Sequence, residues 1–345
     1  MAWSRYLQKN GISKEVPFLV LEPEKSADLG EVLRNHKEEV EKELSSRGAV
    51  LFRGFSNSGE RALNDAISAL GGAPMSYTYR STPRTSVGAG VYTATEYPAA
   101  LEIPMHNENA YQRNWPMRLA FHCVQPAVTQ GQTPLADTVR VTSKIDRGTL
   151  KEFSERGVRY VRNYMDRFDL PWHVVFQTKE KEEVERFCEL NGIEYQWREG
   201  GLRTSQICQG TAVHPITNEQ VWFNQSQLFH VTSLGSDRAA DMISLFTEAN
   251  LPRNAYFGDG AKIPEDTIAK ISGLFESEKL IFDWKKDDLL IIDNMKISHG
   301  RRPYTGQRRV LVAMWAPFSE MGPQATNSSR LNESPHNPSE RRRLA

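Results

Sequence analysis

Residues 103–111, with the sequence IPMHNENAY, place a histidine and a glutamate two positions apart in a segment that favours an extended backbone. In a strand, side chains at positions i and i+2 point to the same face, so His106 and Glu108 should project side by side. An imidazole and a carboxylate are two of the three protein ligands in a 2-His-1-carboxylate metal site. The tripeptide alone is a weak signal, because a surface turn would also explain it. A metal site requires a fold that brings a second histidine to the same point.

The second histidine has a candidate near the other end of the chain. Residues 289–292 form an apolar run typical of a buried strand, and a polar turn then leads to His299. Gly300 and Arg301 follow, and Arg308 and Arg309 open the next apolar run at 310–315. His299 is therefore a candidate for the third ligand.

Composition excludes several classes of protein. The 345 residues carry 43 basic and 43 acidic side chains, so the balance of charge does not indicate a nucleic-acid-binding protein. The three cysteines are scattered without CxxC spacing, which indicates neither a disulfide framework nor a zinc knuckle. No apolar run approaches the roughly 18 residues that a membrane span needs. We therefore expect a cytoplasmic protein that does not enter a membrane.

Apolar periodicity predicts both helices and strands. The first expected helix carries His36 on its apolar face, and His122 lies within an apolar strand, so both are interpreted as packed histidines. Residues 1–318 are expected to form a single domain with helical insertions around 143–275, and residues 319–345 a mobile tail. Helices are expected at 26–48, 62–70, 143–156, 179–191, 236–249 and 265–276, and strands at 16–21, 49–52, 119–124, 280–282, 289–292 and 310–315.

Three motifs together carry a resemblance to a known family. They are His106-x-Glu108, the segment 131–137 with Thr133, and the segment 293–303 followed by the two arginines. In this order and spacing they resemble the iron(II)- and 2-oxoglutarate-dependent dioxygenases of the taurine dioxygenase and clavaminate synthase-like type, over roughly residues 45–317. The resemblance implies an α+β, mainly β fold: a distorted double-stranded β-helix, which is a jelly roll of cupin-like type, with flanking helices.

The resemblance also implies roles for individual residues. His106, Glu108 and His299 would hold Fe(II) and form the catalytic centre, and Thr133 would hydrogen-bond the distal carboxylate of 2-oxoglutarate. An arginine would pair with the same carboxylate, because a guanidinium matches a carboxylate in a bidentate way. Arg309 is preferred over Arg308, since position 309 shares its strand face with Leu311 and Ala313.

The expected substrate follows from the resemblance and from one departure. In taurine dioxygenase a second arginine, four residues beyond the first, binds the substrate sulfonate, and with Arg309 as the first that position is Ala313. A sulfonate is therefore not expected. The resemblance favours hydroxylation of an amino acid or amino-acid-derived substrate, free or carrier-bound, in specialised metabolism, with O2 consumed and succinate and CO2 released. Residues considered as pocket lining are Arg80, Arg84, Glu96, Asn109, Asn224 and Gln225.

Alternative functions remain open at this stage. Related halogenases replace the carboxylate ligand by a small residue, so the retention of Glu108 favours hydroxylation over halogenation. Desaturation, cyclisation and epoxidation share the same ligands and stay possible, as does a non-catalytic jelly-roll binding protein. A zinc hydrolase with the same three ligands is disfavoured, because the chain contains no HExxH helix and Thr133 and Arg309 would have no role.

Overall fold

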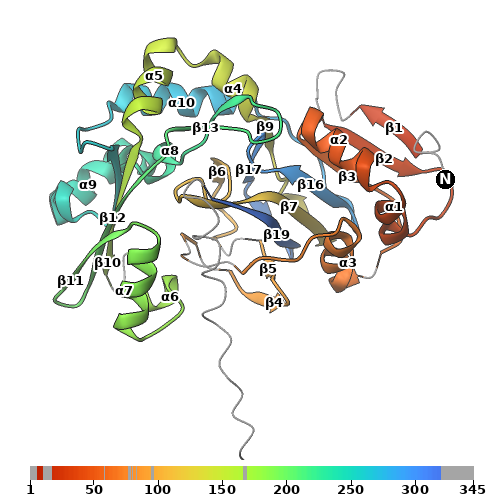
Figure 1. Cartoon of the computed structure of the whole chain (residues 1–345), viewed down its shortest axis with the longest axis horizontal. Coiled ribbons are helices and arrows are strands. Elements are labelled where there is room, and N and C mark those ends of the chain that lie inside the picture. Colours follow the sequence, from red (N-terminus) through yellow and green to blue (C-terminus); the bar gives the residue numbers. More distant parts are fainter. Residues whose placement is uncertain are drawn as a thin grey trace, which may run out of the picture.

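A computed structural model describes residues 6–10, 18–57, 59–76, 79, 81–82, 84–94, 97–165 and 169–319. The fold is mixed α+β with several antiparallel sheets (Figure 1). Of the expected tail, only Ser319 falls within the described residues. No helix in the described ranges combines the length and the apolar character needed to cross a bilayer.

Eight strands form the largest sheet, in which only β2 and β3 pair in parallel. The strands expected at 49–52, 119–124, 289–292 and 310–315 are confirmed, and the one expected at 16–21 is described from Leu19 onward. In spatial order the sheet contains β1 (Tyr6–Asn10), β2 (Leu19–Pro23), β3 (Ala49–Phe52), β16 (Leu289–Asp293), β7 (Asn114–Gln125), β19 (Arg309–Ser319), β5 (Val91–Thr93) and β4 (Ser86–Gly88).

Both faces of this sheet are apolar, but each packs against different elements of the fold. Leu289 and Leu311 pack on the outer face against the helices α1 (Leu29–Asn35), α2 (Lys37–Arg47) and α3 (Ala62–Ala69). Leu290 and Val310, one residue along, belong to a second apolar cluster on the inner face. This alternation follows from the two-residue period of a strand. The helices therefore leave the inner face available for a site.

The single helix expected at 26–48 is wrong, because the structure divides it into α1 and α2. Asp28 caps α1 by accepting a hydrogen bond from the amide of Glu31, and the helical backbone is interrupted at His36. The apolar spacing continues across the break, so periodicity could not reveal it. His36 is 3% exposed, in agreement with its interpretation as a packed side chain.

A three-stranded antiparallel sheet lies opposite the inner face. It consists of β6 (Ile103–His106), β17 (Ile297–Arg301) and β9 (Leu135–Asp137), in the order β6-β17-β9. Leu135 and Ile297 share the apolar cluster of the inner face. The two sheets thus enclose a common interior, and β6 and β17 carry the histidines singled out in the sequence.

The rest of the chain forms a second body of secondary structure beside this interior (Figure 1). Its four-stranded sheet has the order β11 (Glu194–Arg198), β12 (Gly201–Cys208), β10 (Val158–Met165) and β15 (Arg253–Phe257). Its helices are α4 (Thr138–Lys144), α5 (Arg147–Arg156), α6 (Trp172–Val175), α7 (Lys181–Leu190), α8 (Ser226–Phe229), α9 (Ser236–Phe246) and α10 (Glu265–Ser277). It also contains the short elements β13 (Thr211–Val213), β14 (Gln220–Trp222), η3 (Val231–Leu234) and η4 (Glu248–Asn250). Outside it lie the short elements η2 (Gly59–Arg61), β8 (Thr129–Gln130) and β18 (Tyr304–Thr305).

The helices expected at 179–191, 236–249 and 265–276 correspond to α7, α9 and α10. The single helix expected at 143–156 is wrong, because extended backbone at Ile145 and Asp146 separates the end of α4 from α5. The strand expected at 280–282 is wrong. Leu280 forms only an isolated bridge with Leu135, and Phe282 packs in the inner apolar cluster. The apolar character of this run reflects burial without regular pairing.

Gly48, between α2 and β3, should tolerate no side chain. Its φ is +78°, and an added Cβ would lie 2.6 Å from Cγ1 of Ile297 on β17. We expect Gly48→Ala to lower the free energy of unfolding by about 2 kcal/mol, from left-handed strain and overpacking. The exposed helix position Gly273, where an added Cβ meets nothing within 4 Å, is the control. Gly273→Ala should stabilise by about 0.5–1 kcal/mol; equal effects of both variants in urea unfolding would contradict this account.

Candidate metal centre

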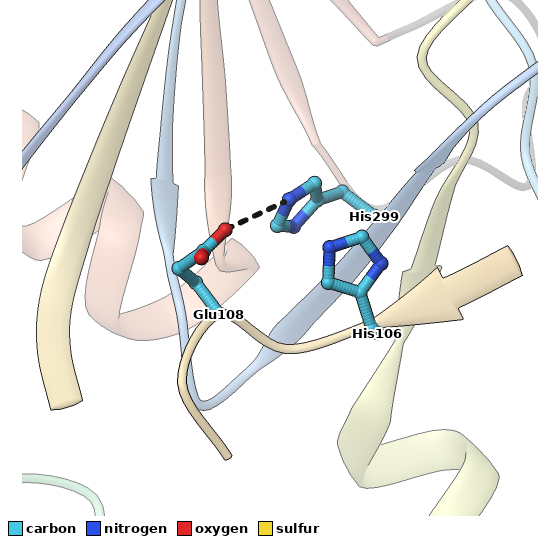
Figure 2. Close-up of side chains that lie close together, drawn as sticks. All are labelled: His106, Glu108 and His299. Atoms are coloured by element: carbon cyan, nitrogen blue, oxygen red, sulfur yellow. Dashed lines mark ion pairs between the residues drawn. The ribbon is translucent and has the colours of Figure 1, made fainter. Parts of the chain in front are cut away.

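Three side chains from distant parts of the chain converge beside the inner face of the large sheet (Figure 2). His106, Glu108 and His299 each offer one ligand atom, and these atoms lie within 4.8 Å of one another. The two imidazole centroids are 4.4 Å apart, and Nε2 of His299 is 3.8 Å from Oε2 of Glu108. The structure therefore brings together the three residues that the sequence singled out.

Strand pairing and one buried amide produce this convergence. His106 and His299 are direct partners across the β6–β17 ladder, which places their side chains next to each other. Glu108 follows β6, and its backbone is held by the side chain of Asn294, which is fully buried. Oδ1 of Asn294 accepts from the amide of Glu108 at 2.7 Å, and Nδ2 donates to the carbonyls of Glu108 and Pro116 at 2.9 and 2.8 Å.

The protein environment keeps both imidazoles neutral. Burial lowers the pKa of His106, although the charge of Glu108 opposes this effect. Burial lowers the pKa of His299 much further, with smaller contributions from His106 and Arg84. Nδ1 of His106 lies 2.8 Å from the carbonyl oxygen of Pro104 and can donate to it, which leaves the Nε2 lone pair for a metal. Neutral imidazoles are the form that binds metals.

A buried ion pair adjoins these ligands. Nη2 of Arg84 donates to Oε2 of Glu108 at 2.6 Å, and both side chains are 4% exposed. The guanidinium compensates the charge of a carboxylate that would otherwise be costly to bury. The donor set of the centre is thus two imidazole nitrogens and one carboxylate oxygen, which matches the facial triad of non-haem Fe(II).

A small inner pocket beside His106 and His299 is lined by a threonine and by three arginines, Arg84, Arg301 and Arg308. Arg308 and Thr133 both line it, with Nη2 of Arg308 3.4 Å from Oγ1 of Thr133. Nε of Arg308 donates to the carbonyl of Gly131 at 2.8 Å, and the indole of Trp284 donates to Oγ1 of Thr133 at 3.0 Å. Burial lowers the pKa of Arg308 to about 10, so its guanidinium remains charged at neutral pH. The pocket can bind an anionic group.

The preference for Arg309 over Arg308 is wrong. Arg309 is exposed and forms an ion pair with Glu60 of η2, outside the pocket. Position 309 does share its face with Leu311, as expected, but that face is the outer one covered by α1–α3. The inner face carries Val310 and Val312, and Arg308 lines the same pocket as these two residues.

A larger cavity of about 430 Å³ opens on the other side of His106 and Glu108. Arg84 lines it together with Gln225, whose Nε2 donates to the carbonyl of Asn107 at 2.7 Å. Asp169 and Arg253, which no sequence motif had marked, also line this cavity.

The remaining candidate lining residues have other positions. Asn224 is buried away from the cavity lining, where its side chain bonds the carbonyl of Gly210 and the amide of Ser226 at the start of α8. Asn109 has a left-handed backbone with φ +58° and lines a separate cavity. The expectation that Asn224 and Asn109 line the substrate cavity is therefore corrected. Arg80 and Glu96 lie outside the described residues.

Comparison with known proteins identifies the family. The model of the family described as "Taurine catabolism dioxygenase TauD, TfdA family" matches residues 13–315. The chain belongs to this family.

Individual relatives agree with the TauD-family assignment. The chain is 40% identical over 300 residues to the dapdiamide synthesis protein DdaC of Enterobacter agglomerans, covering 87% of this chain and 91% of that protein. It is 29% identical over 332 residues to a clavaminate synthase-like protein of Arabidopsis thaliana, covering 89% and 96%. The crystal structure of PvcB from Pseudomonas aeruginosa has the same fold, with a TM-score of 0.54 and 16% identity over 91% of this chain and 92% of PvcB.

Family membership makes this protein an Fe(II)- and 2-oxoglutarate-dependent dioxygenase. The side chains fit both groups. Two neutral imidazoles and a carboxylate converge as a facial set, and the inner pocket beside them presents a charged guanidinium and a hydroxyl.

The amide of Asn294 should control metal affinity through the backbone of Glu108. We expect Asn294→Ala to weaken Mn(II) binding roughly 10- to 100-fold, as for loss of a group that orients a ligand. It should also cost about 2–4 kcal/mol of stability, because three buried hydrogen bonds are lost. Isothermal titration calorimetry with Mn(II) measures the affinity.

Asn163 on β10 provides the matched control. It is also buried, and its Nδ2 donates to the carbonyl of Leu251 at 2.7 Å, in a different sheet from the metal centre. Asn163→Ala should lower stability without changing Mn(II) affinity. An Asn294→Ala protein that binds Mn(II) as tightly as the unaltered chain would refute the positioning role.

Proposed function

We propose that this TauD-family enzyme hydroxylates a C–H bond of an amino acid or amino-acid-derived small molecule, with release of succinate and CO2. The supporting observation is that the candidate ligands border two cavities of different character. Arg84 lines both cavities; the inner pocket also carries Thr133 and Arg308, and the outer cavity also carries Gln225 and further charged groups. One cavity suits a dicarboxylate cosubstrate, and the other suits a larger polar substrate.

In this proposal His106, Glu108 and His299 hold the iron. When bound, Fe(II) supplies the activation of dioxygen, coupled to oxidation of 2-oxoglutarate, that breaks an unactivated C–H bond. The protein contributes orientation and exclusion of water. Arg84 holds the Glu108 carboxylate at 2.6 Å, and Phe121 packs against the His299 ring with centroids 5.1 Å apart. These contacts restrict the orientations of two ligand side chains.

Arg308 and Thr133 bind the distal carboxylate of 2-oxoglutarate in this scheme. The Trp284 indole donates to Oγ1 of Thr133, so the threonine hydroxyl is free to donate its own hydrogen to a carboxylate. The guanidinium of Arg308 is fixed by the carbonyl of Gly131, which aligns it before the cosubstrate arrives. Such preorganisation reduces the entropy lost on binding.

The outer cavity supports a polar substrate other than a sulfonate. With Arg308 as the carboxylate-binding arginine, the position four residues beyond it is Val312, not Ala313, and Val312 is an apolar residue of the inner pocket. The relative from Enterobacter agglomerans is named as a protein of dapdiamide synthesis, which supports a biosynthetic role. Desaturation or cyclisation of the same substrate class uses the same ligands and is the alternative outcome.

We also propose that residues 1–318 form one domain whose β core is a distorted double-stranded β-helix. The large sheet and the β6–β17–β9 sheet share one apolar cluster, which supports two facing walls of a single jelly roll. The segment 143–275 contributes the second body that borders the outer cavity.

The two neighbouring arginines give a direct test of the cosubstrate site. Anaerobic Fe(II) and 2-oxoglutarate should give the unaltered protein a weak visible charge-transfer band. Arg308→Met should raise the 2-oxoglutarate concentration needed for this band roughly a hundredfold, from loss of a charge-assisted contact. Arg309→Met removes only an exposed ion pair with Glu60 and should leave the titration unchanged. The reverse result would place the carboxylate at Arg309.

Turnover gives the second test. With Fe(II), 2-oxoglutarate, O2 and a panel of free amino acids and their acylated derivatives, at least one compound should stimulate succinate formation, measured by mass spectrometry together with the oxidised product. Glu108→Ala should abolish this stimulation because the facial triad loses its carboxylate. If the charge-transfer band forms but no compound stimulates succinate formation, the amino-acid assignment is wrong. If neither appears in metal-loaded protein, a non-catalytic binding protein is the better description.

A further inference from the structure

The outer cavity is also lined by an acidic and a basic residue that lie far from the metal ligands in the sequence. Asp169 follows β10, and Arg253 begins β15. Both line the cavity that also contains His106, Glu108 and Arg84. A ligand in this cavity can therefore contact the ion pair of the second body and the metal centre of the first.

Asp169 and Arg253 form an ion pair with an incomplete set of hydrogen bonds. Nη2 of Arg253 donates to Oδ1 of Asp169 at 2.7 Å, and the amide of Leu170 donates to the same oxygen. The Asp169 side chain is 4% exposed, and among the described residues its Oδ2 has no hydrogen-bond partner. A buried carboxylate oxygen without a donor is costly, so a ligand that supplies one would be favoured. Because the Cβ–Cγ torsion of aspartate is soft, a small rotation can turn this oxygen toward the cavity.

Arg253 offers the complementary charge. Its side chain is 34% exposed, and its guanidinium lies 5.5 Å from the ring centroid of Phe229, which also lines the cavity. Besides its bond to Asp169, no other side-chain hydrogen bond of Arg253 is found in the described part of the chain. A partly exposed guanidinium with unused donors can bind a carboxylate.

A simple amine would not complement this pair. Asp169 already pairs with the guanidinium of Arg253. A ligand that brings only a cation would compete with Arg253 for this carboxylate and leave the guanidinium without its counter-charge. A ligand that brings an ammonium and a carboxylate together adds no net charge. It also provides both a donor for Asp169 and an acceptor for Arg253.

We propose that Asp169 and Arg253 bind the α-ammonium and the α-carboxylate of the substrate, which is an extended amino-acid derivative with a free α-amino-acid head. The proposal rests on the proposed function and specifies its substrate. A carrier-bound aminoacyl thioester has no free α-carboxylate and is excluded. A cavity of about 430 Å³ has the size of sites for ligands larger than the smallest amino acids. The distal end of the substrate, not its α-carbon, is presented to His106 and Glu108.

The test compares each of two probes with derivatives that differ from it only in the head group. Isothermal titration calorimetry uses the full chain loaded with Mn(II) and 2-oxoglutarate. The probes are γ-L-glutamylglycine and L-glutamine, each with its Nα-acetyl and α-carboxamide derivatives. The unaltered protein should bind at least one free-head probe roughly 10- to 100-fold more tightly than both blocked forms, as expected for charge-assisted hydrogen bonds. Equal affinity for free and blocked forms, or no binding of any free-head probe, would overturn the proposal.

Two variants assign the discrimination to the two residues. Asp169→Asn should remove the preference for the free amine over the Nα-acetyl form, and Arg253→Gln should remove the preference for the free carboxylate over the carboxamide. A purely structural ion pair would lower stability but leave these affinity ratios unchanged. The control is Asp259→Asn, which breaks an Arg–Asp pair with Arg156 beyond the other end of β15 and should leave both ratios unchanged.

The same samples separate failure of this proposal from failure of the proposed function. Anaerobic Fe(II) replaces Mn(II), and the charge-transfer band with 2-oxoglutarate is recorded. If the charge-transfer band is normal but the protein binds free and blocked head groups equally, only the head-group assignment is wrong. If the unaltered protein shows no band, the proposed function is wrong, whatever the probe affinities are.

Discussion

The turn between β16 and β17 is the constraint on which the metal centre depends. Asn294 in this turn fixes the backbone of Glu108, and the strand that follows carries His299. The preceding residue, Asp293, anchors the turn: its Oδ2 accepts from Arg118 at 2.6 Å and lies 2.9 Å from Nε2 of His214. Burial would raise the pKa of Asp293, but the contacts with His214 and Arg118 lower it overall, so the carboxylate stays ionised. A buried, fully partnered turn of this kind holds two ligands in one rigid unit.

The parts of the site that could be predicted from sequence are those fixed by local geometry. His106 ends β6 and Glu108 lies in the turn just beyond it, so their two-residue separation indicated their proximity, but strand alternation is not its cause. The apolar run before His299 indicated that this residue lies beside a strand of the same core. Alternation separated Arg308 from Arg309 correctly. What alternation cannot supply is which face is inner, because β19 is apolar on both sides and packs against helices on one of them. The choice between the two arginines therefore required the arrangement of α1–α3.

The roles of several residues could not be predicted from the sequence, because these roles depend on contacts between distant segments. Asn224 and Gln225 are adjacent amides of the same polar character, yet the first bonds the backbone of Gly210 and Ser226 whereas the second borders the cavity. Asp169 and Arg253 lie 84 positions apart and carry no motif. Sequence composition can indicate that a segment is polar, but it cannot distinguish a polar group that satisfies the backbone from one that faces a ligand. That distinction depends on which buried carbonyls and amides the fold brings nearby.

The metal ligands and much of the outer cavity belong to different parts of the fold, and this division has a chemical consequence. His106 and His299 lie on paired strands, and Glu108, Thr133 and Arg308 lie in segments directly next to strands, whereas much of the outer cavity is formed by loops and short helices between Asp169 and Arg253. Loops on a rigid scaffold can change shape without disturbing the scaffold. The centre that activates oxygen can therefore remain constant while the second body determines which carbon lies beside it. Selectivity in such an enzyme is a matter of position, because the same oxidising centre attacks whichever bond is held nearest.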